Sequence, residues 1–275
     1  MLEAAYTREV LGLARHAGLD AAGVAPAAPF ERARAALRDR VERGQHAGMA
    51  FTFADPDRST DPGRVVRGAR ALVVGAHAYE TGDGGHDAGR PLHGRVARYA
   101  RTDHYRTLRS SLQQVADRLR TDGWKAVVTA DENHLVDREA AYLAGLGWYG
   151  KNANVLLPGR GSWFVLGEVV TDAPLVPATR PAADGCGGCR RCLDGCPTAA
   201  IVAPGVVDAR RCLAWLVQQP GTFPVEHRAA LGDRIYGCDD CQEVCPPNHV
   251  RRHREPDRPD AAEATWVDLV ALLAA

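Results

Sequence analysis

The chain has 275 residues, 45% of them apolar, so it can bury a sizeable core as one large domain or as a domain with a smaller insert. Its 34 basic and 34 acidic side chains cancel, which excludes overall charge as a basis for binding nucleic acid. No apolar run approaches the ~18 residues that span a bilayer, and Glu3, Arg8 and Glu9 stand where a signal peptide would be apolar. We therefore expect a globular protein of the cytoplasm that does not bind membranes.

The first half of the chain is expected to form helices and strands that end at an acidic turn. Apolar side chains recur at helical spacing over residues 5–17 and 30–44, which predicts two surface helices. ALVVGAHAY (71–79) predicts a buried strand, followed by a Gly- and His-rich loop over 81–94 that is long enough to be functional. Residues 104–123 predict an amphipathic helix ending at a glycine, and 125–130 predict the next strand. This order places Asp131 at the carboxyl end of a strand.

The middle of the chain continues the alternation. Residues 136–147 predict a short helix, and NANVLLP and SWFVLGEVVTD predict strands around a GRGS turn. The pattern indicates a sheet covered by helices, of α+β or α/β class, and it lacks both the G-x-G-x-x-G and the Walker A signatures of nucleotide binding. A Pro-rich connector follows at 174–185, and the chain ends in a basic polar stretch and one apolar helical segment.

All eight cysteines come after residue 185. CGGCRRCLDGCP (186–197) has the C-x2-C-x2-C-x3-C-P spacing with which bacterial ferredoxins bind [4Fe–4S] clusters. In that arrangement the fourth cysteine ligates the other cluster, so a second set is required. That rule assigns Cys186, Cys189, Cys192 and Cys245 to one cluster and Cys196, Cys212, Cys238 and Cys241 to the other.

Cysteines have two other common uses in proteins, disulfides and zinc sites. Disulfides do not suit a cytoplasmic chain, whereas two structural zinc sites remain an alternative because four thiolates also bind zinc. Two clusters form an electron-transfer path that either serves another protein or feeds a redox centre in residues 1–185. The length of that N-terminal part favours the second option.

Several segments together resemble the epoxyqueuosine reductases, the cobalamin- and iron–sulfur-dependent enzymes of queuosine synthesis in tRNA. The matching stretches are RVARYAR (95–101) with Tyr105, Asp131, AGLGWYGKNANVLLPGRGSWFVLGEVVTD (144–172), CGGCRRCLDGCPTAAIV (186–202) and GDRIYGCDDCQEVCPPN (232–248). The resemblance implies an α+β fold, with a cobalamin-binding domain like nitroreductases and reductive dehalogenases and a two-cluster ferredoxin-like module. It implies domains at residues 1–180 (cobalamin-binding), 181–250 (ferredoxin-like) and 251–275 (start of a C-terminal helical, HEAT-like region).

The resemblance also implies the site. Asp131 falls on the catalytic aspartate that protonates the epoxide oxygen, although a strand-end turn or helix-cap aspartate is the ordinary interpretation of that residue alone. Tyr99, Arg101 and Tyr105 are pocket or RNA contacts, or part of the core. The residues implied to contact cobalamin are Arg58, Asp131, Lys151, Asn152, Ala214, Asp239 and Asp240.

The implied cofactors are two [4Fe–4S] clusters and base-off cobalamin, which needs no protein histidine; His134 then has a polar-turn role. The implied partners are tRNA carrying epoxyqueuosine and an electron donor such as a flavodoxin or ferredoxin, and we expect a monomer. Two features depart from the family. Its D-S-x-P segment is Asp131-Glu-Asn-His here, and the chain ends at Ala275 where the HEAT-like region begins, so the basic run Arg251–Arg254 is either a phosphate contact or a solvated tail.

Two alternative functions remain. One is reduction of a small molecule by a related, reductive dehalogenase-like cobalamin and iron–sulfur enzyme, which the changed Asp131 segment leaves open. The other is a ferredoxin-type electron-transfer protein in which residues 1–185 are only a docking scaffold. Cobalamin binding separates the electron carrier from both enzymes, and dependence on tRNA separates the two enzymes.

Overall fold

The computed structural model describes residues 2–79, 92–249 and 266–274. The loop predicted over 81–94 lies almost entirely outside these residues, and the basic run at 251–254 lies wholly outside them. Within them, no helix combines the length and the apolar content that crossing a bilayer requires.

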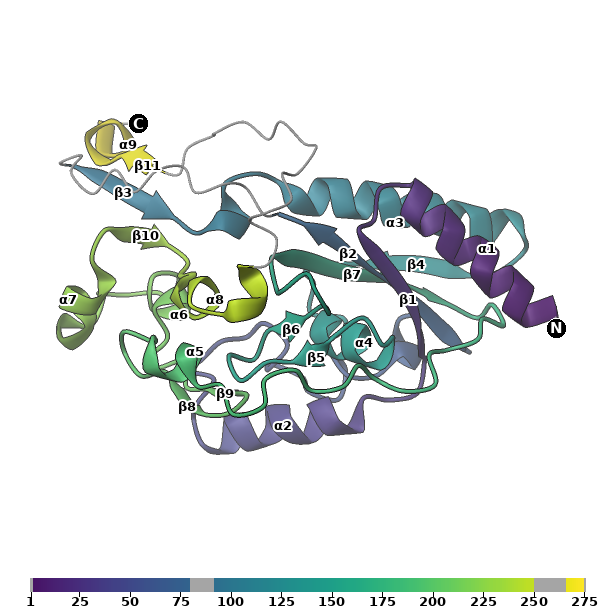
Figure 1. Cartoon of the computed structure of the whole chain (residues 1–275), viewed down its shortest axis with the longest axis horizontal. Helices are drawn as coiled ribbons and strands as arrows, with labels where there is room; N and C mark the ends of the chain where they lie inside the picture. The colour runs from purple at the N-terminus through teal and green to yellow at the C-terminus, as the bar shows by residue number, and fades with distance from the viewer. Residues whose placement is uncertain (1, 80–91, 250–265, 275) are drawn as a thin grey trace.

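A four-stranded sheet forms the centre of the molecule (Figure 1). Its strands are β1 (Ala21–Pro26), β2 (Ala71–Ala78), β7 (Phe164–Thr171) and β4 (Ala126–Thr129), in the order β1-β2-β7-β4. Every neighbouring pair is antiparallel, which makes the fold α+β and excludes the α/β option. All eight residues of β7 are buried, because the sheet is covered on both faces.

The two faces of β7 enter two apolar cores. Val165 and Val169 pack with the inner side of α3 (His104–Thr121), a helix that α1 (Leu2–His16) also contacts. Leu166 and Val170 pack on the other side, with α4 (Asp137–Leu143) and the start of α2 (Glu31–Glu42). The helices predicted from periodicity are therefore present, whereas β1 was missed because AAGVAP is a short, alanine-rich strand.

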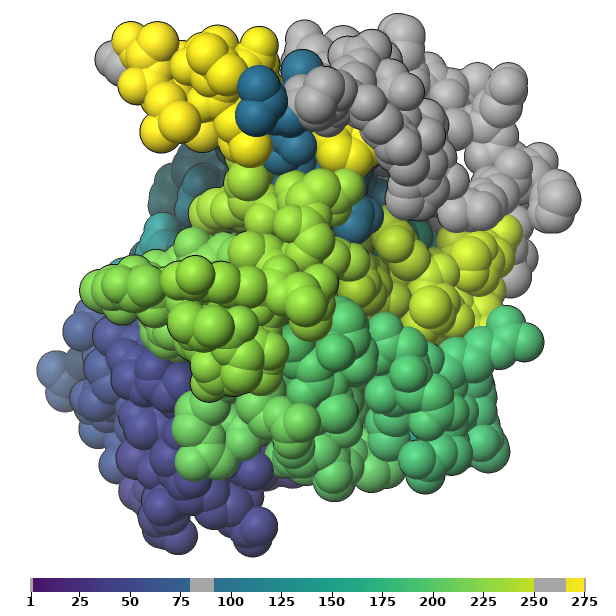
Figure 2. Space-filling model, turned by 90° about the vertical axis from the view of Figure 1, so that its left-hand side faces the viewer, coloured from purple at the N-terminus to yellow at the C-terminus, as the bar shows by residue number. Residues whose placement is uncertain are grey.

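The cysteine-rich part is built from short elements. They are α5 (Arg191–Asp194), β8 (Ile201–Ala203), β9 (Val206–Val207), α6 (Leu213–Leu216), the 3-10 turn η3 (Val225–His227), α7 (Arg228–Leu231), β10 (Arg234–Tyr236), α8 (Asp240–Glu243) and the 3-10 turn η4 (Pro246–Asn248). Figure 2 shows this segment in green, seated on the purple segment that contains α2 and the residues after it. The Ala209 amide donates to the Gln45 carbonyl at 2.8 Å and the Trp215 indole N–H to the Ala47 carbonyl at 3.2 Å. These bonds join the cysteine-rich segment to the N-terminal half.

A second sheet, of order β10-β3-β11, lies above the cysteine-rich segment (Figure 1). Its centre is β3 (His93–Val96), and β11 (Trp266–Asp268) pairs with β3 in antiparallel fashion. The sequence predicted one helical segment at the end of the chain. Instead, residues 266–268 are extended because they complete this sheet, and only α9 (Leu269–Ala274) is helical.

Smaller elements complete the chain. They are the 3-10 turns η1 (Pro62–Arg64) and η2 (Arg98–Ala100) and the hairpin of β5 (Trp148–Tyr149) with β6 (Val155–Leu156). The Asn248 side chain closes the contact between this region and the cysteine-rich segment, because its Oδ1 accepts a hydrogen bond from the Ser162 amide at 2.6 Å. The adjacent Gly161 has φ +72°, and a Cβ there would overlap Asn248.

Candidate functional site

Asp131 occupies a strained turn at the end of β4. Its φ of +54° lies in the left-handed region, which a residue with a Cβ adopts only at a cost. The turn is held from two sides. The Arg109 guanidinium of α3 donates to the Ala130 carbonyl at 2.6 Å, and the Asp131 amide donates to Asp137 Oδ2 of α4 at 3.2 Å. Asp131 as a whole residue is exposed, while its carboxyl is partly buried.

The electrostatic surroundings suit an acid. Partial burial raises the pKa of Asp131, and Arg109, Tyr105 and Arg138 offset part of that rise. A carboxyl with a raised pKa keeps its proton closer to neutral pH and can give it to a leaving oxygen. The placement of Asp131 at a strand end is as predicted; its catalytic role stays a prediction.

The residues that replace D-S-x-P make contacts of their own. His134 Nδ1 lies 2.8 Å from Glu132 Oε2, and Asn133 Oδ1 accepts a hydrogen bond from the Thr52 amide at 3.0 Å. The second bond ties the Asp131 turn to the loop that carries Arg58.

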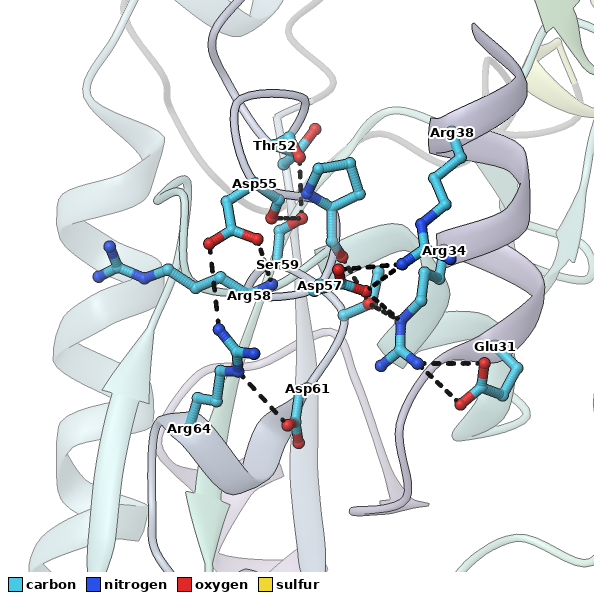
Figure 3. A network of polar contacts seen from close by, with 12 residues as sticks. Glu31, Arg34, Arg38, Thr52, Asp55, Asp57, Arg58, Ser59, Asp61 and Arg64 are labelled. Carbon is cyan, nitrogen blue, oxygen red and sulfur yellow. Dashed lines mark hydrogen bonds and ion pairs between the residues drawn. The ribbon is translucent and has the colours of Figure 1, made fainter. Parts of the chain in front are cut away.

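Figure 3 shows how that loop is built. Asp55, Asp57 and Asp61 accept hydrogen bonds or ion pairs from backbone amides and from Arg34, Arg38 and Arg64. The Arg58 side chain points away from this network, is exposed, and has no hydrogen bond or ion pair within the described ranges. Its guanidinium group is therefore available to a ligand that carries an anionic or carbonyl oxygen.

A buried acid that sequence reasoning missed lies behind the turn. Glu168, in the middle of β7, has 0% of its surface exposed, and Thr129 Oγ1 donates to its Oε1 at 2.8 Å. Burial raises the pKa of both Glu168 and Asp137. The single charged residue inside the apolar strand FVLGEVVT was the signal that could have revealed it.

The eight thiols are all free, and they lie close enough for their charges to act on one another. Burial and the charges of Cys192, Cys186 and Cys189 together raise the pKa of Cys245 to about 12. Burial likewise raises the pKa of Cys241, together with the charges of Cys238, Cys212, Cys196 and Cys192. The assignment of individual cysteines to one cluster or the other stays a prediction.

Thiols this close, with raised pKa values, need a compensating positive charge to ionise together, and cluster irons supply it. Among the described residues no Cys, His, Asp or Glu side chains converge tightly enough to hold a single metal ion. The cluster assignment therefore rests on the grouping of the thiols.

Lys151 and Asn152 fix the cysteine loops. The Lys151 ammonium donates to the carbonyls of Gly187 at 2.6 Å and Cys189 at 2.9 Å, and the Asn152 amide donates to the Cys241 carbonyl at 3.2 Å. Each therefore orients one group of thiols, a contact that the sequence did not predict.

The acidic pair after Cys238 also has protein partners. Asp239 is buried and accepts from the Arg98 amide at 2.7 Å, and Asp240 forms an ion pair with Arg234 at 2.5 Å. Ala214 lies in α6, where its amide lowers the pKa of Cys212 against the larger effect of burial. Whether these residues also contact cobalamin stays a prediction.

The aromatic residues predicted as pocket or RNA contacts are half-buried. Tyr99 lies 6.2 Å from Tyr236 between ring centroids, and Tyr105 hydrogen-bonds Asp131 and so lowers its pKa. Arg101 donates to the Val96 carbonyl at 3.2 Å. Tyr105 is thus part of the Asp131 site.

Comparison with known proteins gives a consistent result. A family model described as a 4Fe-4S double cluster binding domain matches residues 185–248. Epoxyqueuosine reductase of Xanthomonas campestris pv. campestris is 39% identical over 275 residues, covering 94% of this chain and 76% of the relative. The epoxyqueuosine reductase of Bacillus cereus is 35% identical, covering 91% and 68%.

Solved structures agree. A crystal structure of epoxyqueuosine reductase with a tRNA-Tyr epoxyqueuosine-modified stem loop has a TM-score of 0.86 at 32% identity, covering 98% of this chain and 73% of that one. A Bacillus subtilis epoxyqueuosine reductase whose aspartate catalytic loop is swung out of the active site matches with a TM-score of 0.86, 31% identity and the same coverage. A catabolic reductive dehalogenase, at 18% identity and a TM-score of 0.58, shares the fold over 90% of this chain and 32% of its own. These matches confirm the predicted fold class and a domain for two [4Fe–4S] clusters.

Proposed function

The chain belongs to the epoxyqueuosine reductase family, and from that premise we propose that it uses cobalamin to reduce epoxyqueuosine in tRNA to queuosine. The reaction breaks both C–O bonds of an epoxide, forms a C=C bond and releases the oxygen as water. It consumes two electrons and two protons. Two [4Fe–4S] clusters suit the delivery of single electrons, and Asp131 suits the delivery of a proton.

The observation that carries the proposal is that one chain, related over most of its length to epoxyqueuosine reductases, holds both a two-cluster segment and the Asp131 turn. The charge of Arg138 of α4 acts on both parts, since it lowers the pKa of Asp131 and of Cys212. We propose that electrons from the clusters and a proton from Asp131 serve the same reaction. The two cysteine groups are also neighbours, since the charge of Cys192 acts on Cys241.

The residues around this place fit a cobalamin. Arg58 and Arg138 are exposed, and their side chains have no hydrogen-bond or ion-pair partner in the described ranges. Guanidinium groups suit the phosphate of such a cofactor. Cobalamin supplies a low-valent metal centre whose reducing power no side chain has. We assign its contacts to Arg58, Asp131, Lys151, Asn152, Ala214, Asp239 and Asp240, with the base-off form requiring no histidine.

Each part of the chain has its own role in this proposal. We assign residues 1–180 to cobalamin and substrate, 181–250 to the clusters and 251–275 to the start of a further region. A relative of known structure is seen with an epoxyqueuosine-modified stem loop, which supports tRNA as the substrate here. A flavodoxin or ferredoxin would supply the electrons to a monomeric protein of the cytoplasm.

The test is anaerobic reconstitution with iron, sulfide and cobalamin, followed by reaction with a strong reductant and tRNA that carries epoxyqueuosine. The masses of the nucleosides from the digested tRNA are then measured by mass spectrometry. We expect conversion to queuosine, seen as loss of one oxygen atom. A protein that holds both clusters and cobalamin yet leaves the epoxide intact would refute the proposal.

The two alternatives are less well supported. The dehalogenase likeness shows the fold alone, because the sequence identity is 18%. A ferredoxin-type electron carrier needs only its cluster loops, whereas 91–94% of this chain aligns with epoxyqueuosine reductases.

A further inference from the structure

We infer that Asp137 and Glu168 form a carboxyl pair that shares one proton, positions Asp131, and refills it with a proton during turnover. The inference rests on the proposed function, because it concerns the acid of that reaction. Figure 1 shows the elements concerned: β4 and β7 lie side by side, and α4 packs over their face.

The first step is the burial of Glu168. Its side chain points to the face of β7 that also carries Leu166 and Val170, and no part of it is exposed. An ionised carboxylate without a positive partner costs several kcal/mol in such surroundings. Within the described residues, Glu168 accepts a hydrogen bond from the Thr129 hydroxyl, a neutral group, at its Oε1.

The second step is an oxygen that lacks a donor. Glu168 Oε2 is buried and has no hydrogen-bond partner among the described residues. Asp137 bonds the Asp131 amide and Glu168 bonds Thr129, two residues earlier, so the two carboxyls lie beside the same short segment and interact with each other. A proton held between the two carboxyls supplies the missing donor and removes the repulsion between two negative charges, as in other paired acids.

The third step links the pair to the reaction. Asp137 Oδ2 accepts the hydrogen bond of the Asp131 amide, the residue whose φ of +54° needs support. Reduction of the epoxide needs two protons. Asp131 gives the first to the epoxide oxygen, the pair returns a proton to the Asp131 carboxylate, and Asp131 gives the second as the oxygen leaves as water. Solvent then reprotonates the pair through Asp137, which is partly exposed, whereas Glu168 is not.

Other titratable and charged groups face the pair. Asp131 and Glu132 of the turn oppose ionisation, and Arg138 of α4 favours it. Tyr105 of α3 faces both Asp131 and Asp137, and Arg109 of α3 acts on Asp131. We infer that the burial of both carboxyls outweighs the attraction of Arg138 and keeps one proton on the pair.

Three variants of the full chain, carrying clusters and cobalamin, test the inference. Glu168→Gln keeps the size and can still hydrogen-bond Thr129 and Asp137, but it cannot share a proton. Asp137→Asn keeps an acceptor for the Asp131 amide and likewise carries no proton. Glu139→Gln is the control, since Glu139 is equally buried in α4 but pairs with Arg32 and lies away from Asp131.

The direct measurement is infrared spectroscopy at neutral pH without substrate, where ordinary carboxyls of pKa about 4 are ionised. We expect a band of a protonated carboxyl in the native protein and in Glu139→Gln, and its loss in the other two variants. A native protein without that band, or one that keeps it in Glu168→Gln and Asp137→Asn, overturns the shared proton.

Turnover tests the role. We expect kcat in Glu168→Gln and Asp137→Asn to fall roughly 10- to 100-fold, with KM unchanged and the basic limb of the kcat profile moved to lower pH. Unchanged kcat and profile overturn the refilling role. A native protein that never reduces the epoxide refutes the proposed function and the refilling with it, while the infrared result still decides whether the proton is shared.

Discussion

At the scale of single residues, the site depends on how burial is balanced. Asp131 keeps a partly exposed carboxyl on a left-handed turn, while Glu168, on the neighbouring strand β7, has lost all contact with solvent. A carboxyl group therefore serves as an accessible acid at Asp131 and as a neutral internal group at Glu168.

Asp131→Asn should abolish most turnover without disturbing the cofactors. An amide cannot give the proton, and removing a general acid costs about 10²–10⁴-fold in rate. The iron content and the cobalamin spectrum of the variant serve as controls. Activity equal to that of the native protein would remove Asp131 from the role.

Serine variants of the cysteines should sort into two classes. Because Cys189 and Cys245 lie in one group of thiols, Cys189→Ser and Cys245→Ser should leave the same remaining cluster, about four irons per chain. Cys196→Ser and Cys241→Ser should share a different remaining cluster. Electron paramagnetic resonance of the reduced variants measures this. Matching spectra for Cys245→Ser and Cys241→Ser would contradict the assignment.

The stability of the fold should fall with pH because of Glu168. Its pKa in the folded state is raised, so between the unfolded value of about 4.3 and the raised value the folded chain binds more protons than the unfolded chain. The contribution is fully present below that window and is lost as pH rises through it, by up to roughly 1.4 kcal/mol per pH unit. Urea midpoints at pH 5, 6 and 7 should therefore fall less steeply in Glu168→Gln than in the native protein.

At the scale of elements, the seam between the sheet and the cysteine-rich segment depends on close backbone approach. The GRGS turn before β7 meets η4, where Ser162 and Asn248 exchange hydrogen bonds and Gln242 joins them through the Ser162 hydroxyl at 2.9 Å. The position of the clusters relative to Asp131 is therefore set partly by a glycine-rich turn.

Gly161→Ala should destabilise the protein more than Gly159→Ala does. Both glycines have positive φ, so both substitutions carry a strain of about 1–2 kcal/mol. Only a Cβ at Gly161 meets another residue, Asn248, whereas Gly159 has nothing within 4 Å. Equal urea midpoints for the two variants would show that this contact does not hold the segment.

At the scale of the whole molecule, the two halves differ in what holds them together. The sheet and its helices carry most of the buried apolar side chains. The buried apolar residues of the cysteine-rich segment are few: Cys192, Ala200, Ile201, Ala209, Leu213, Leu216 and Cys245. A segment with so small a core depends on its metal centres for stability.

Removal of iron should therefore loosen residues 185–248 selectively. Chelation under anaerobic conditions is expected to raise amide exchange in α5, α6 and α8, while β2 and β7 keep their protection. Hydrogen exchange with mass spectrometry of the holo and chelated protein compares the two. If both halves lost amide protection equally, or if neither half lost any, this division would be contradicted.

The sequence by itself determined the two-cluster segment, the main helices, the central strands β2 and β7 and the position of Asp131 at a strand end, because periodicity, cysteine spacing and strand ends are local properties. It did not reveal β11, whose extended conformation depends on pairing with β3. Nor did it reveal the contacts of Lys151 with the Cys189 loop or the pair of Glu168 and Asp137. These join residues distant in the chain, and only tertiary packing decides which donor reaches which carbonyl and which carboxyl loses its water.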